Sequence, residues 1–139
     1  MFEASVLSVI TVDATLISYL STHKEAPSMF FNSAPEGVDF NYLVFDILDE
    51  GNEDDPAIDL FVLTFSLFGY SKSGADIQDA AKRIVELLDH THLSSSYYDT
   101  IRIYKREIRF IPKDDPKAQH YRVSFDARAG RSGWMNTLT

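Results

Sequence analysis

Five acidic residues crowd one short stretch of the 139-residue sequence and could in principle bind a divalent cation: Asp49, Glu50, Glu53, Asp54 and Asp55. Carboxylate oxygens suit Ca²⁺ and Mg²⁺, but a calcium-binding loop also needs a fixed alternation of acidic residues around a central glycine. This stretch lacks that alternation and separates two apolar runs. We therefore interpret it as the solvated turn of a hairpin and predict no metal site.

Four basic residues in one predicted strand are the second candidate: Arg102, Lys105, Arg106 and Arg109. Clustered lysine and arginine are typical of nucleic-acid-binding surfaces. Successive side chains of a strand point to opposite faces, so we expect Arg102 and Arg106 to lie opposite Lys105 and Arg109. The patch would then be divided, and solvated charges that protect an edge strand from aggregation are the favoured interpretation. We retain the acidic and basic groups as candidate partner interfaces.

Other residue types give no support for catalysis. His90 and His92 form an H-x-H at the end of a predicted helix, where two-residue spacing does not place both on one face. Ser94, Ser95 and Ser96 lack the glycines of a nucleophile elbow. The six glycines form no phosphate-binding loop, and the chain has no cysteine. We predict neither an enzyme nor a bound cofactor, and no catalytic, cofactor-binding or metal-ligating residue is assigned.

The charge of the chain is unevenly distributed. The formal net charge is -8, which disfavours avid binding to phosphate backbones. Residues 1–60 contain twelve acidic residues and one lysine, whereas residues 100–139 contain nine basic and four acidic residues. The two parts could neutralise each other within one fold. Alternatively, the acidic side of one subunit could meet the basic side of the next, head to tail.

Length and hydropathy predict one soluble domain at residues 1–129, followed by a flexible arm at 130–139. There is no basic, apolar leader and no apolar run that could cross a membrane, so we expect an unexported protein. A first helix, interrupted near Thr11 to Asp13 with Asp13 as N-cap, precedes a loop that holds a short extended segment at 29–31.

Strands are predicted at 42–48, 58–70, 101–111 and 120–128, because apolar residues alternate or run continuously there. The long 58–70 strand is apolar on both faces, so we expect it in the centre of the sheet or in a subunit interface. Its length would also allow it to project beyond the sheet as one arm of a hairpin. A helix is expected near 75–88, where Ile77, Ala81, Ile84 and Leu88 form a stripe. The fold class is therefore α+β: one mixed or antiparallel sheet of about four main strands with two principal helices packed on it.

This order of segments resembles the tail-terminator, or tail-completion, proteins of long-tailed bacteriophages and prophages. The resemblance is carried over residues 2–128 by a set of segments: Val12-Asp13-Ala14-Thr15-Leu16-Ile17, the loop with Pro35, Tyr42-Leu43-Val44-Phe45, the apolar strand 60–70, Ala80-Ala81-Lys82-Arg83-Ile84-Val85-Glu86-Leu87-Leu88 and His120-Tyr121-Arg122-Val123-Ser124-Phe125. It rests on element order and hydrophobic pattern, and the family has no catalytic motif to transfer. The acidic stretch and the tail after Arg128 depart from its pattern.

The resemblance implies a structural virion protein that forms a six-fold ring at the head-proximal end of the tail. Its partners would be other copies of itself, the tail tube protein and the head–tail connector or stopper, with genome DNA passing through the ring and assembly in the host cytoplasm. Such a ring needs no cofactor and binds no membrane or specific nucleic acid. The acidic tip would face a partner ring or the tube. A head-completion or tail-tube subunit is the close alternative, and a small-ligand or metal-binding domain is the distant one.

Overall fold

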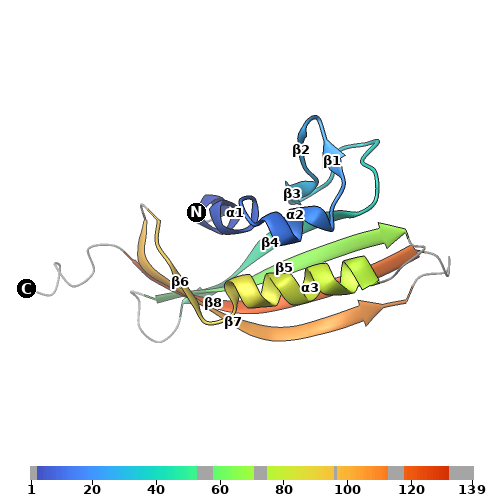
Figure 1. The fold of residues 1–139 in the computed structure, drawn as a ribbon. Helices are drawn as coiled ribbons and strands as arrows, with labels where there is room; N and C mark the ends of the chain where they lie inside the picture. The colour runs from blue at the N-terminus through green and yellow to red at the C-terminus, as the bar shows by residue number, and fades with distance from the viewer. Residues whose placement is uncertain (1–2, 53–57, 71–74, 96, 113–117, 132–139) are drawn as a thin grey trace, which may run out of the picture.

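The computed structural model describes residues 3–52, 58–70, 75–95, 97–112 and 118–131. In these parts of the chain the elements follow the order α1 (Glu3–Ile10), α2 (Ala14–Ser18), β1 (Thr22–His23), β2 (Ala26–Pro27), β3 (Met29–Phe31), β4 (Tyr42–Asn52), β5 (Ile58–Tyr70), α3 (Ala75–Leu88), β6 (Thr91–Leu93), β7 (Tyr98–Ile111) and β8 (Ala118–Arg131). Figure 1 shows a long, curled sheet with the helices gathered on one side of it.

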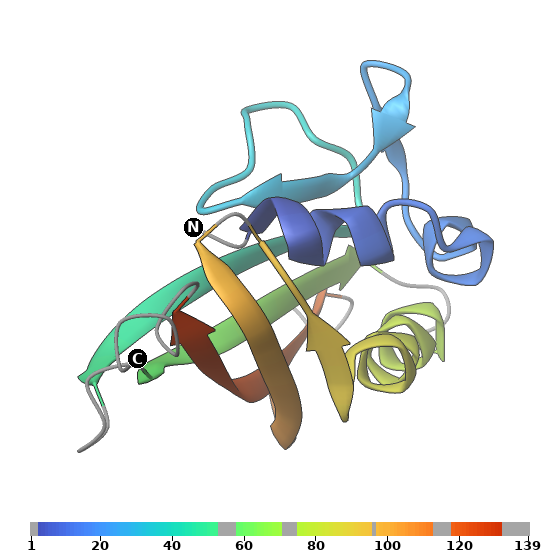
Figure 2. The same ribbon diagram turned by 90° about the vertical axis from the view of Figure 1, so that its left-hand side faces the viewer.

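The main sheet has six strands in the order β3-β4-β5-β8-β7-β6. Two long hairpins, β4–β5 and β7–β8, lie side by side and pair through β5 and β8. The short strand β3 runs parallel to β4, and all other pairs are antiparallel. A separate ribbon, β1–β2, rises from the N-terminal region (Figures 1 and 2). The prediction that the 58–70 strand is central is confirmed.

One hydrophobic core joins the three helices to one face of this sheet. Helix α3 contributes the predicted stripe, since Ile77, Ala81, Ile84 and Leu88 are all buried. The sheet contributes alternate residues, such as Phe65 of β5. The three helices therefore cover the same face, as Figure 2 also shows. We call the other face the open face and define it by the cross-strand row Val44, Ser66, Arg122 and Arg109.

The structure corrects the predicted element counts. The main sheet has six strands where about four were expected, because β3 and β6 contain three residues each and are too short to show a periodic pattern. The N-terminal segment is divided into an eight-residue and a five-residue helix, so α3 with 14 residues is the one principal helix. The predicted interruption near Thr11 to Asp13 and the extended segment at 29–31 are both confirmed.

Asp13 begins α2 and also connects it to α3. Its carboxylate accepts a hydrogen bond from the backbone N–H of Leu16 at 2.8 Å, which is the predicted N-cap. The Arg83 guanidinium of α3 donates to both carboxylate oxygens, at 3.0 and 2.7 Å. Helical spacing alone would pair Arg83 with Asp79, but Arg83 contacts Asp13 and Glu86 instead. A contact between helices thus replaces the expected one within the helix.

The long strands differ from the expectations at their ends. Strand β5 pairs with β8 from Ile58 to Tyr70, so no part of it projects beyond the sheet. Strand β8 continues through Gly130 and Arg131, the first two residues of the expected arm. The remainder of that arm, at 132–139, lies outside the described residues.

Candidate interaction surfaces

The acidic group lies at the far end of β4. Asp49 and Glu50 are exposed, and the Asp49 side chain accepts a hydrogen bond from the backbone N–H of Gly51 at 2.8 Å. Gly51 has a φ of 91°, a backbone conformation that favours glycine, at an irregularity in the pairing with β5. Glu53, Asp54 and Asp55 lie outside the described residues. Within the described residues, no group of three or more His, Cys, Asp or Glu side chains could hold a metal ion.

A bulge in β7 changes the expected division of the basic residues. The register with β8 shifts between Lys105 and Glu107, so an extra residue is inserted there. Arg102 and Arg109, which strict alternation would separate, therefore both lie on the open face. Arg106 reaches Asp126 of the same face at 3.8 Å. The predicted division holds for Arg102 and Arg106 against Lys105 and was wrong for Arg109 alone, because a bulge inverts the alternation that follows it.

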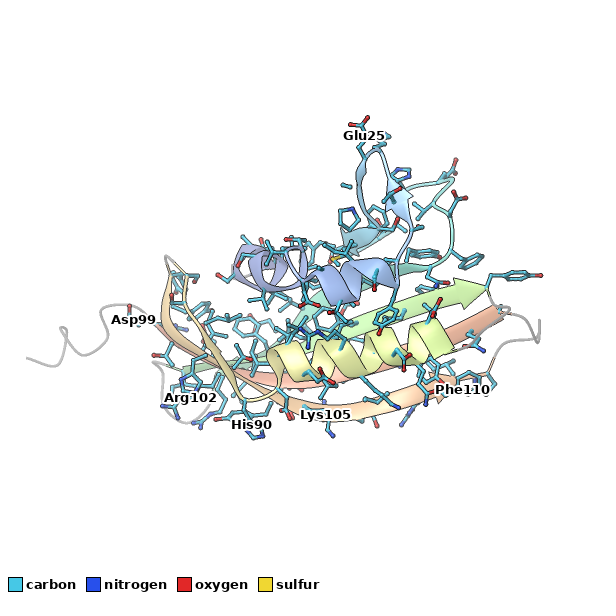
Figure 3. The ribbon with its side chains drawn as sticks, in the orientation of Figure 1. Glu25, His90, Asp99, Arg102, Lys105 and Phe110 are labelled. Atoms are coloured by element: carbon cyan, nitrogen blue, oxygen red, sulfur yellow. The ribbon has the colours of Figure 1, made fainter. Side chains whose placement is uncertain are left out.

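Lys105 is the exception among the four basic residues. It lies level with Phe125, a core residue, on the helix-covered face. Its backbone N–H donates to the Asp89 side chain at 2.6 Å, just after the end of α3. Figure 3 shows Arg102, Lys105 and Phe110 in sequence along β7. Three of the four predicted basic residues are thus brought together, and the fourth is turned away.

Two arginines of β8 complete a basic strip that sequence reasoning missed. Arg128 lies directly opposite Arg102, and Arg122 lies directly opposite Arg109. Like charges in opposed positions of a sheet disfavour its folding, and carboxylates of the same strands offset part of this repulsion, since Glu107 lies 3.5 Å from Arg109 and Asp126 lies 3.8 Å from Arg106. The alternation of apolar and polar residues over 120–128 predicted a solvent-exposed face, but the sequence did not predict the register of this strand with β7.

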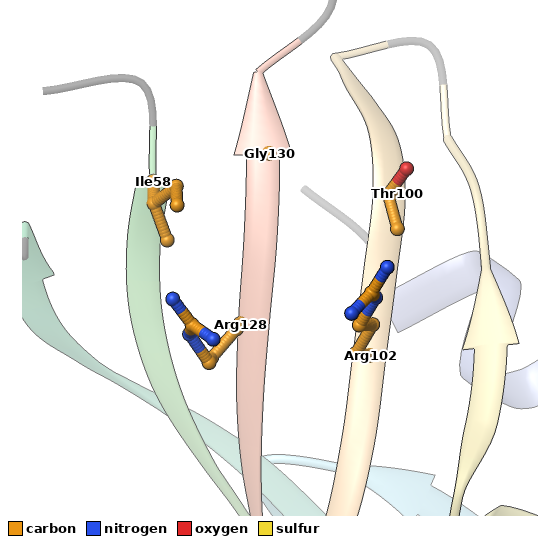
Figure 4. A pocket seen from close by; sticks show the side chains of 5 residues that line it. All are labelled: Ile58, Thr100, Arg102, Arg128 and Gly130. Atoms are coloured by element: carbon orange, nitrogen blue, oxygen red, sulfur yellow. The ribbon is translucent and has the colours of Figure 1, made fainter. Parts of the chain in front are cut away.

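The Arg102–Arg128 pair lines an open pocket of about 310 Å³, together with Ile58, Thr100 and Gly130. Figure 4 shows these side chains on three neighbouring strands at one end of the open face. Two guanidinium groups beside an apolar wall can accept a carboxylate or another small anionic group.

A buried polar cluster fastens the same end of the sheet. Asp59 of β5 is 8% exposed and accepts hydrogen bonds from the Tyr98 hydroxyl at 2.7 Å and from Arg131 at 2.9 and 3.3 Å. The Arg131 guanidinium holds the pKa of Asp59 below its usual value. Burial and the neighbouring Asp59 carboxylate raise the pKa of Tyr98. The cluster joins β5, β7 and β8, and Arg131 neutralises the buried Asp59 carboxylate within it.

Aromatic rings cross the opposite end of the open face. Tyr42 stacks on Phe68 with centroids 5.1 Å apart, and Phe68 stacks on His120 at 4.3 Å. Phe40 extends the row beside Tyr42 at 5.6 Å and is 49% exposed. The two ends of the open face therefore differ in chemistry, one basic and one aromatic.

The outer borders of the sheet are only partly paired. Strand β3 pairs with β4 at Leu43 to Phe45, and β6 pairs with β7 at Ile101 to Ile103. In the described parts of the chain, no strand pairs with the outer side of β4 at 47–52 or of β7 at 106–111. We call 47–52 the acidic edge, because it carries Asp49 and Glu50, and 106–111 the basic edge, because it carries Arg106 and Arg109.

No described helix is long and apolar enough to cross a membrane. No protein family model and no curated protein matches this sequence. The fold, however, is found in solved structures. A chain of the virion of a native gene transfer agent particle superposes with a TM-score of 0.72 over 91% of this chain and 92% of that chain, at 16% identity. A second solved structure, known by a sequence identifier alone, gives a TM-score of 0.63 over 92% of both chains, at 10% identity. The chain therefore shares its fold, over nearly its whole length, with a component of a phage-like particle.

Proposed function

We propose that this chain is a structural subunit of a phage-like virion and that it forms a closed ring at the head-proximal end of a tail. The observation that carries the proposal is the likeness, over 91% of the chain, to a chain of a gene transfer agent virion. The element order and hydrophobic pattern point independently to the tail-terminator family. An assembly role requires no catalytic group, cofactor or metal.

The proposed mechanism is steric. One face of the ring reproduces the contact that a tail tube subunit offers, so the ring can bind the end of a finished tube. The other face does not repeat that contact, and the tube therefore stops growing. The second face would instead be available to the head–tail connector. The partners are thus further copies of this chain, the tube protein and the connector, and genome DNA would pass through the ring.

Native mass spectrometry combined with electron microscopy of the purified chain tests this function. We expect a closed oligomer of six copies, seen as rings of uniform diameter. Extended tubes would instead indicate a tail-tube subunit, because a tube subunit propagates its own contact on both faces. A chain that stays monomeric up to millimolar concentration and is absent from isolated tails would contradict the proposal.

A small-ligand or metal-binding domain is the alternative of a different class, and the Arg102–Arg128 pocket is the observation that favours it. A thermal-shift series with divalent cations, nucleotides and short dicarboxylates examines it directly. A ligand that binds the native state raises the unfolding midpoint in proportion to the logarithm of its concentration. Such a rise, lost in Arg102→Ala but kept in Arg83→Ala, would favour ligand binding at this pocket.

A further inference from the structure

We propose that the ring closes by strand-to-strand pairing, in which the acidic edge of β4 in one subunit adds to the basic edge of β7 in the next. This inference rests on the proposed ring and specifies the surfaces that form it. An unpaired strand edge presents a row of backbone donors and acceptors that another chain can complete. The two edges lie at opposite borders of the same sheet, because β5 and β8 separate β4 from β7.

The backbone directions of the two edges are compatible. The Leu43 N–H and the Phe45 carbonyl bond outward to the β3 side, so alternation directs the backbone groups of Ile47 and Asp49 outward as well. On β7, the Ile103 carbonyl bonds outward to His90, and the bulge transfers this orientation to Ile108 and Phe110. Strands β4 and β7 run in opposite directions, so a neighbour related by rotation would pair antiparallel.

The side chains of the two edges are compatible too. Ile47, Ile108 and Phe110 all lie on the helix-covered face, with Ile108 40% and Phe110 49% exposed. Pairing of the edges would bring them together and extend the core across the subunit boundary. On the open face, Leu48 is 60% exposed and would cover the apolar stem of an arginine of β7.

Charge restricts which edges can meet. Two acidic edges would bring Asp49 and Glu50 against their own copies. Two basic edges would bring Arg106 and Arg109 against their own copies, although Asp126 at 3.8 Å and Glu107 at 3.5 Å offset part of that positive charge within each subunit. Like charges directly opposite each other destabilise a strand pair. Only the acidic and basic edges attract, so the contact is heterologous. A heterologous contact generates a ring where the rotation closes.

The position of the two edges along the strands suits a closed sheet. Asp49, in the middle of the acidic edge, is level with Phe61 of β5, whereas Ile108 is level with Val123 and hence with Phe65. The offset along the strands is therefore about 14 Å, and the four long strands together with the gap to the next subunit span about 19 Å. A neighbour that aligns the edges tilts the strands by about 35°, which is the tilt of closed β-barrels.

Introduced cysteine pairs test the contact cleanly, because the chain has no cysteine of its own. Leu48→Cys is combined in turn with Glu107→Cys, Arg109→Cys or Ile111→Cys, all on the open face. Within one subunit β4 and β7 are three strand spacings apart, so these positions are separated by at least about 14 Å, twice the reach of a disulfide, and any bond must join two copies. We expect one pair to give a covalent ladder up to the full ring. The matched control is Leu48→Cys with Ile108→Cys, which lie on opposite faces and should give little linkage.

A mixing experiment provides a second readout. Asp49→Lys/Glu50→Lys makes both edges basic, and Arg106→Glu/Arg109→Glu makes both acidic. Each variant alone should need about tenfold more protein to form rings, whereas an equal mixture should restore them as alternating rings. Asp76→Lys/Asp79→Lys, an equal charge change on the exposed side of α3, is the control and should assemble normally.

The outcomes separate the two proposals. Rings without open-face linkage and without rescue by mixing would overturn the edge contact and leave the ring function intact. A chain that forms no rings under any condition would overturn both. Linkage of the opposite-face control as efficiently as the open-face pairs would also refute edge pairing, because it would indicate contact without a defined register.

Discussion

Asp13 offers the sharpest test of how the helices are held on the sheet. Replacing it by alanine removes three hydrogen bonds, one from the Leu16 backbone and two from Arg83. Loss of an N-cap costs about 1 kcal/mol of the free energy of unfolding. Hydrogen bonds to charged groups contribute about 1.5–3 kcal/mol when shielded. The Arg83 side chain is 29% exposed, so we take about 1 kcal/mol for the pair. We therefore expect Asp13→Ala to lower stability by about 2 kcal/mol.

Two matched variants divide this loss into its parts. Asp13→Asn keeps an oxygen that can cap α2 but removes the charge, so it should cost about 1 kcal/mol. Asp79→Asn removes the acidic residue that helical spacing would pair with Arg83, and it should change stability by less than about 0.5 kcal/mol. Urea unfolding followed by far-ultraviolet circular dichroism at pH 7 measures all three, with an unchanged denaturant slope as the check on two-state behaviour.

The pH dependence gives an independent measurement of the same contact. The Arg83 guanidinium lowers the pKa of Asp13 in the folded state. The stabilisation is therefore complete above the ordinary aspartate pKa of about 3.9 and is lost as the pH falls through the folded value. Asp13→Asn should flatten this acid limb. The reasoning fails if Asp79→Asn costs as much as Asp13→Asn, or if Asp13→Ala is as stable as the wild type.

Four further outcomes are expected. Ring assembly should weaken as sodium chloride is raised, because exposed charges are screened over about 8 Å at physiological ionic strength; sedimentation that is independent of salt would exclude a charge contribution. Reversing the charge of four basic residues together should loosen ring assembly while the circular dichroism spectrum stays native; these are Arg102, Lys105, Arg106 and Arg109. Normal assembly of this variant at low salt would show that the four residues are only solvated charges on an edge strand. The raised pKa of Tyr98 should make it ionise above the ordinary tyrosine range, and Tyr98→Phe should remove that step from an absorbance titration. The contribution of Tyr98 to the free energy of unfolding should be complete below about pH 10 and be lost only as the pH rises through the folded pKa. Neutralising Glu53, Asp54 and Asp55 to Gln and Asn should leave rings intact but impair the joining of heads to tails. Complementation of a terminator-deficient phage and the lengths of its tails measure this effect. A wild-type titre with uniform tails would show that the three residues have no role in joining.

Local pattern was sufficient for the elements that bury one face of a long segment. The stripe from Ile77 to Leu88 predicted α3, and alternation predicted residues 42–48 of β4 and 120–128 of β8, because burial repeats with the period of the element itself. Asp13 was identified as a cap from its type and position, since capping depends on neighbours within one turn. Strand β6 could not be found in this way, because three residues do not complete a pattern, and β3 was predicted only as a short extended segment without a place in the sheet.

The candidate surfaces depended on information that is not local. The acidic and basic residues were identified by type, but their grouping was not, because the bulge between Lys105 and Glu107 becomes visible only in the register with β8. The same register places Arg122 and Arg128 beside the basic residues of β7. Similarly, Arg83 binds Asp13, 70 residues away, as well as Glu86 of its own helix, and does not pair with Asp79 as helical spacing would suggest. Pairings of this kind follow from the sheet order, which hydrophobic pattern alone does not specify.

The sheet order also gives a physical meaning to the two oppositely charged parts of the sequence. Neutralisation within the fold occurs at Asp59 of β5, which binds Arg131 of the neighbouring β8. The acidic edge of β4 and the basic edge of β7, in contrast, lie apart with β5 and β8 between them. A monomer gains little from this separation, because charges three strands apart are about 14 Å from each other and are largely screened. In an assembly the same separation brings unlike edges together and keeps like edges apart, which protects against disordered aggregation and selects head-to-tail contact. Under the proposed ring, the separated acidic and basic edges serve contact between subunits, whereas the Asp59–Arg131 pair serves the single fold.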